Sequence, residues 1–140
     1  MKYIAYRKGY KYQLAEEFTV SVDIFPLKDI VTEFITLTTE GMLTLNAGYA
    51  SDGPSGPTLD TPSSIRGAFA HDPLYQLIRM GLLCPSLRKQ CDQIAYNLWI
   101  EDGMYKWRAW IWRRELNKFG SAAADPKNIK KVYIAPRRKK

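Results

Sequence analysis

Residues 61–78 read TPSSIRGAFAHDPLYQLI, and the spacing of the apolar residues changes at this point in the chain. Thr61, Ser63 and Ser64 are good helix N-cap residues. One broad helical face then follows, made of Ile65, Ala68, Phe69, Asp72 and Tyr75. The stretch therefore predicts the first helix of a helical second half.

The residues before this helix alternate in the manner of strands. Three runs rich in β-branched and aromatic side chains predict strands at 18–25, 33–38 and 42–45. The last two runs are separated by a short connection containing Gly41, which suits an antiparallel hairpin. Residues 27–31 form the link between the first strand and that hairpin.

Two more helices are expected after the first. Pro85 begins one that runs to about Asp102, with Gly103 as its stop, and a tryptophan-rich helix runs to about Phe119 before Gly120. The predicted fold is α+β, with an antiparallel β-rich N-terminal half packed on two or three C-terminal helices. Residues 1–126 are long and apolar enough for a single compact domain.

The net charge of +7 is concentrated in residues 127–140, which hold seven basic residues and no acid. The remaining 14 basic residues balance the 14 acids, so the rest of the chain is neutral. The tail ends in Arg137, Arg138, Lys139 and Lys140, after a short run at 132–135 that suits an edge strand. Such a tail attracts nucleic acid, anionic phospholipid or an acidic protein surface, or serves as a solvated end.

Several classes are disfavoured by the residues present. No stretch is long and apolar enough for a transmembrane segment, and the first residues lack the apolar centre of a signal peptide. One histidine and two widely spaced cysteines do not make a zinc site. Cys84 and Cys91 are compatible with one bridge but not with a disulfide framework.

The lone histidine, His71, is the strongest candidate for chemistry because it can move a proton near neutral pH. Tyr75 lies four residues on, so it shares a helical face with His71, and Asp72 can lie beside both. Asp92 falls midway along the next helix, where it could accept a hydrogen bond from the imidazole. Pro73 places a kink or break near His71, because proline inside a helix costs about 3 kcal/mol.

A glycine-bearing loop, then His-Asp-x-x-Tyr, then Cys-Asp-x-x-Ala on a following helix resembles the active site of the secreted phospholipase A2 superfamily. The resemblance implies that His71 is the base that activates water, Asp92 orients it and Tyr75 supports it. It also implies a calcium ion on Asp72 and on loop carbonyls near Ser51, Gly53 and Ser55. The chain departs from that family in lacking dense disulfides and a signal peptide, and in carrying about sixty residues ahead of the loop.

A second resemblance covers about residues 40–110. The loop at 51–57, Arg66-Gly67, His71-Asp72-x-Leu74-Tyr75 and the pair Arg88 and Asp92 look like an uncharacterised family of short proteins from tailed bacteriophages and prophages. This likeness implies a viral origin, with the virion or the host cytoplasm as the location, and it implies no activity.

These residues and the two resemblances lead us to expect one of two functions. The first is a bacteriophage protein with a phospholipase A2-like, calcium-dependent ester-hydrolase site. The second is a noncatalytic virion or assembly protein that binds neighbouring subunits or DNA through its aromatic helix and basic tail. Trp107, Arg108 and Trp110 serve either one, as a lipid headgroup contact or as a protein interface, and the sequence leaves open whether the protein is an enzyme and what its oligomeric state is.

Overall fold

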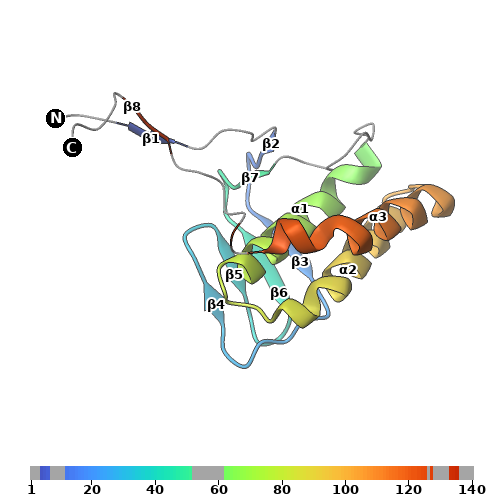
Figure 1. Ribbon diagram of the computed structural model, residues 1–140, viewed down its shortest axis with the longest axis horizontal. Coiled ribbons are helices and arrows are strands. Elements are labelled where there is room, and N and C mark those ends of the chain that lie inside the picture. The colour runs from blue at the N-terminus through green and yellow to red at the C-terminus, as the bar shows by residue number, and fades with distance from the viewer. Residues whose placement is uncertain (1–3, 7–11, 52–61, 126, 128–132, 136–140) are drawn as a thin grey trace.

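The computed structural model shows an α+β protein with antiparallel sheets in its N-terminal half and three helices in its C-terminal half (Figure 1). It describes residues 4–6, 12–51, 62–125, 127 and 133–135. The predicted fold class is therefore confirmed. The helices are α1 (Pro62–Arg79), α2 (Arg88–Glu101, preceded by a 3-10 turn at Pro85–Leu87) and α3 (Lys106–Ala124).

The main sheet has four strands in the order β3-β6-β5-β4, all antiparallel. Their bounds are β3 (Phe18–Ser21), β4 (Ile30–Val31), β5 (Ile35–Leu37) and β6 (Met42–Leu45). The hairpin between β5 and β6 is confirmed, and Gly41 takes a φ of 81° in its turn, which favours glycine. The predicted link at 27–31 contributes the edge strand β4, a short element that the sequence analysis did not separate from a loop.

The first strand is shorter than predicted. β3 ends at Ser21, yet Val22 and Ile24 remain buried beyond it while Asp23 and Phe25 are exposed. The alternation of inward and outward side chains therefore continues to residue 25, although the strand pairing does not, and this is why the pattern predicted a longer strand.

Two small ribbons complete the β structure. β2 (Tyr12–Gln13) pairs with β7 (Ala50–Ser51), and β7 also contacts α1. β1 (Ile4–Tyr6) pairs with β8 (Tyr133–Ala135), so the strand expected near the C-terminus pairs with the N-terminal segment and not with the main sheet. Figure 1 shows this β1–β8 ribbon extending away from the helices.

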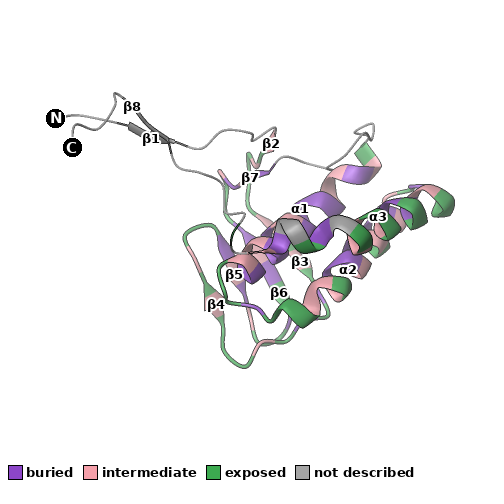
Figure 2. Cartoon of the chain, in the orientation of Figure 1, coloured by how far each residue is buried: buried purple, intermediate pink, exposed green. Residues whose placement is uncertain are grey.

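The core has two layers. One face of the sheet packs against α1 and α2 through a single apolar cluster that includes Ile35, Leu37, Leu43, Leu45, Phe69, Leu74, Leu77 and Leu98. A second cluster joins α2 to α3 and contains Ala95, Trp99, Met104, Ala109 and Trp112. Figure 2 shows the buried residues concentrated on α1 and on the strands that face it. α2 is thus held from both sides.

Two sequence expectations about the helices need correction. α1 runs from Pro62 to Arg79 without a break, and Pro73 lies fully buried within it. α3 does not stop at Gly120 but continues to Ala124. Gly120 lies inside the helix, where it allows α3 to pack closely against α1 and α2. A Cβ at Gly120 would collide with the Tyr75 hydroxyl and would lie 3.1 Å from Arg88 Nη1.

Gly67 has the same role between α1 and α2. A Cβ there would lie 2.5 Å from Trp99 Nε1 and 2.6 Å from Trp99 Cδ1, and the Trp99 indole donates a hydrogen bond of 3.1 Å to the Ser64 carbonyl. The absence of a side chain at residue 67 lets the indole lie directly on the α1 backbone.

We predict that Gly67→Ala destabilises the protein, although alanine is the better helix former by about 1 kcal/mol. Overpacking against the indole should cost about 1–3 kcal/mol and outweigh that gain. The free energy of unfolding in urea measures the net loss. In a Trp99→Phe background, where the smaller ring leaves room, Gly67→Ala should cost less stability than it does in the wild type. If the losses of the two single variants simply add in the double variant, the packing argument is wrong.

Candidate functional site

The candidate site lies where α1 crosses α2. His71 and Tyr75 are one turn apart on α1, and Asp92 faces them from the middle of α2. His71 Nε2 lies 2.7 Å from Asp92 Oδ1, and the Tyr75 hydroxyl donates to the same oxygen over 2.5 Å. The two rings also touch, with centroids 4.0 Å apart. The structure therefore brings together the three residues predicted to form the catalytic group.

The Asp92 carboxylate is completely buried and accepts both of these hydrogen bonds. Its other oxygen, Oδ2, has no hydrogen-bond partner among the described residues and lies 3.9 Å from Arg88 Nη1. Arg88 is one turn before Asp92 on α2, so its positive charge balances the carboxylate inside the protein.

Arg88 also ties α3 to the site. Its Nη1 donates to the carbonyls of Leu116 and Asn117, at 3.2 Å in each case. The sequence analysis named Arg88 and Asp92 only as part of a family resemblance and gave Arg88 no role, and it treated Gly120 as a helix stop. The i,i+4 spacing on one helix indicates the contact between Arg88 and Asp92. No local feature of the sequence indicates that Arg88 also bonds to α3.

The hydrogen-bond pattern fixes the state of the imidazole. A carboxylate only accepts, so Nε2 carries a proton and Nδ1 of the neutral ring is left as the basic nitrogen. Burial alone would lower the pKa of His71, but the nearby carboxylates of Asp72 and Asp92 outweigh it and leave the pKa above its usual value. Burial and the nearby Asp92 carboxylate raise the pKa of Tyr75 far above its usual value, so the phenol remains a donor.

Asp72 forms the outer edge of the site. One of its carboxylate oxygens lies 3.8 Å from His71 Nδ1, and the other accepts a hydrogen bond from the Ser51 hydroxyl on β7. The Asp72 side chain is 33% exposed, whereas that of His71 is 8% exposed. Of these two side chains, Asp72 is therefore the one more accessible to solvent. Gly53 and Ser55, predicted as further calcium ligands, lie outside the described residues.

A calcium ion needs six to eight oxygen ligands. Asp72 suits such an ion because its carboxylate is a hard oxygen donor, is partly exposed, and is held in place by Ser51. Within the described part of the chain, no group of three or more histidine, cysteine or acidic side chains could hold a metal. Near His71, the described residues thus offer such an ion the Asp72 carboxylate and the Ser51 hydroxyl, which are fewer ligands than it needs.

The three residues on the third helix that were predicted to contact a partner differ in exposure. Trp107 and Trp110 are exposed, while Arg108 is partly buried with its guanidinium 4.5 Å from the centre of the buried Trp112 ring. Arg137, Arg138, Lys139 and Lys140 lie outside the described residues. Both cysteines are free, with Cys84 exposed and Cys91 buried, and burial raises the pKa of the Cys91 thiol to about 12.

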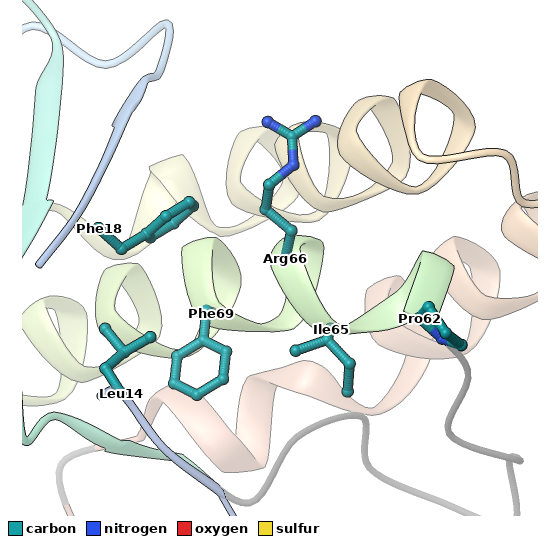
Figure 3. Close-up of a pocket in the computed structure, with 6 residues that line it drawn as sticks. All are labelled: Leu14, Phe18, Pro62, Ile65, Arg66 and Phe69. Carbon is teal, nitrogen blue, oxygen red and sulfur yellow. The ribbon is translucent and has the colours of Figure 1, made fainter. Parts of the chain in front are cut away.

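An open apolar pocket lies on another side of α1, lined by Leu14, Phe18, Pro62, Ile65, Arg66 and Phe69 (Figure 3). The Arg66 guanidinium points away from it in this view and pairs instead with Asp102, at 2.7 Å, and Glu101, at 3.1 Å. The pocket therefore receives no charge from Arg66 and contains none of the site residues named above.

No family model, curated protein or solved structure matches this chain. None of the helices in the described part of the chain is long and apolar enough to cross a membrane. The function is therefore argued from the geometry of the site.

We predict that Tyr75→Phe lowers the free energy of unfolding by about 1.5–3 kcal/mol, because the phenol donates to a charged, fully buried acceptor. Tyr49→Phe is a matched control, since the hydroxyl of this buried tyrosine donates to a neutral amide, Gln76 Oε1, over 3.1 Å. Its loss should cost about 0.5–1.5 kcal/mol. Urea unfolding measures the loss of stability in the two variants. Equal losses would contradict the prediction that the charged Asp92 acceptor makes the Tyr75 hydrogen bond the stronger of the two.

Proposed function

We propose that this protein is a bacteriophage ester hydrolase of the phospholipase A2-like kind, with His71 as general base and an anionic phospholipid as substrate. The observation that carries the proposal is the bond of 2.7 Å between His71 Nε2 and the buried Asp92 carboxylate. It leaves Nδ1, on the other side of the ring, directed toward the partly exposed edge at Asp72. The phage origin rests on the sequence resemblance alone.

In the proposed reaction, His71 Nδ1 removes a proton from a water molecule as the water oxygen attacks the ester carbonyl carbon. Asp92 stabilises the imidazolium that forms, and Tyr75 keeps the carboxylate in place. The carbon–oxygen bond to the alcohol then breaks, and the imidazolium returns the proton to the leaving oxygen. The products are a carboxylic acid and an alcohol, so no oxidant or further reactant is needed.

Calcium is the proposed cofactor. Asp72 and Ser51 would hold it together with loop residues that include Gly53 and Ser55. When bound, the ion would polarise the ester carbonyl and stabilise the negative charge on its oxygen. The Ser51 hydroxyl already orients the Asp72 carboxylate, which lies 3.8 Å from His71 Nδ1.

We predict that the purified protein releases fatty acid from phosphatidylglycerol vesicles in the presence of calcium, and that His71→Gln lowers the rate at least about 100-fold. Glutamine can still donate a hydrogen bond to Asp92 but cannot act as a base, so the variant separates chemistry from packing. Lys28→Gln, at an exposed residue in the bend before β4, is the control and should keep the wild-type rate. Equal rates for His71→Gln and wild type would exclude His71 as the base.

We predict that calcium raises the melting temperature of the wild-type protein and that Asp72→Asn abolishes this shift. A ligand that binds only the folded state adds stability of about 2.7 kcal/mol when its concentration is 100 times the Kd. Magnesium is the control ion, because it demands a tighter octahedral geometry. A calcium shift of equal size in Asp72→Asn would remove the metal from the proposal while leaving the His71 test untouched.

One observation favours the second candidate, a noncatalytic virion or assembly protein. The His71 side chain is only 8% exposed, and an imidazole bonded to a buried aspartate also serves to join two helices. In that function the aromatic helix and the basic tail would bind neighbouring subunits or DNA. Stable wild-type protein with no ester hydrolysis, and no response to calcium, would support this function.

A further inference from the structure

The helix α3 uses one face for the core and leaves the other uncovered. Ala109, Trp112, Gly120 and Ala124 are buried along its inner side. The residues between them, at helical spacing on the opposite side, are Trp107, Trp110, Ile111, Arg114 and Lys118, and we call these the α3 outer face. Figure 2 shows exposed residues along the outside of this helix.

The N-terminal part of the α3 outer face is strongly apolar. Trp107, Trp110 and Ile111 are 65%, 48% and 43% exposed, and Tyr105 just before the helix is 74% exposed. Such large side chains on adjacent turns form a continuous patch and not scattered exposed residues. The indole rings have both an apolar surface and an N–H donor, a combination that suits the boundary between hydrocarbon and water.

The helix that carries this patch has an excess of positive charge. The helix has five basic residues, Lys106, Arg108, Arg113, Arg114 and Lys118, against the single acid Glu115. The Arg114 guanidinium lies 5.7 Å from the centre of the Trp110 ring, so the charge is held beside the apolar surface. Lys106 and Arg108 lie in the first turn, which contains no acidic residue.

The segment that forms the main sheet carries the opposite charge. Residues 12–51 contain six acids and one basic residue, Lys28. The sequence analysis treated the chain before the tail as neutral, but the structure separates its charges into an acidic sheet side and a basic third helix. Of these two parts of the fold, an anionic surface would therefore attract α3 and repel the main sheet.

We propose that the α3 outer face docks on an anionic phospholipid bilayer, with Trp107, Trp110 and Ile111 entering the headgroup boundary and Arg114 and Lys118 contacting phosphates. A second apolar patch near the sheet edge, at Leu27 and Val31, lies among acidic residues and lacks this charge complementarity. The proposal deepens the proposed function by assigning the face that meets the substrate surface. Membrane binding does not require catalysis, so an experiment can refute docking without refuting ester hydrolysis, and the reverse.

The experiment uses the full chain and vesicles of phosphatidylcholine, with or without phosphatidylglycerol. Vesicle sedimentation gives the affinity, and quenching of tryptophan emission by brominated acyl chains shows which residues enter the lipid. Trp99 and Trp112 are buried, so quenching reports on Trp107 and Trp110. We expect binding only with the anionic lipid, quenching in the wild type, and loss of quenching with retained binding in Trp107→Phe/Trp110→Phe.

The affinity should fall about tenfold or more in Trp107→Ala/Trp110→Ala, and it should also fall in Arg114→Gln/Lys118→Gln. Leu27→Ala/Val31→Ala is the matched control for exposed apolar side chains and should bind as the wild type does. His71→Gln should also bind normally, which separates docking from hydrolysis.

Three results would overturn the proposal. Binding without tryptophan quenching would assign the vesicle contact to the basic tail and not to α3. Equal losses in Trp107→Ala/Trp110→Ala and in the control would remove the patch from binding. Displacement of the vesicles by duplex DNA, with the tryptophans quenched by the DNA instead, would assign the α3 outer face to nucleic acid.

Discussion

The buried Asp92 carboxylate is the interaction on which the helical half depends. A charge with no access to water is tolerated only if donors and an opposite charge surround it. His71 and Tyr75 supply the donors from α1, and Arg88 supplies the charge from α2 itself. Because Arg88 also donates to two α3 carbonyls, one carboxylate fixes the positions of all three helices.

The backbone accommodates this arrangement through glycine at two contacts. Gly67 lets the Trp99 indole lie on α1, and Gly120 lets α3 approach Tyr75 and Arg88. Neither glycine serves as a helix stop, and neither has the positive φ of Gly41. Their role is to shorten the distance between helices, so that the polar network around Asp92 can form without leaving voids.

Local features of the sequence predicted much of this structure, while long-range contacts did not show in it. The alternation up to residue 25 and the hairpin at Gly41 indicated the sheet, and the spacing of His71 and Tyr75 placed both on one face. Gly120 looked like a helix stop because glycine is favoured both at the C-terminal ends of helices and where two helices pack closely. Charge separation was hidden as well, since acids and bases that balance along the chain can still lie on opposite sides of the fold.

The burial of His71 makes the edge at Asp72 decisive for any chemistry. The dyad itself is protected, with one imidazole nitrogen committed to Asp92 and the ring packed on Tyr75. A group so enclosed keeps its tautomer and orientation, which a general base requires, and loses access to bulk water. Access to Nδ1 then depends on Asp72 and on Ser51, which orients it. In the proposed function, the same short region would govern both cation binding and the approach of substrate, so a change at Asp72 would affect both.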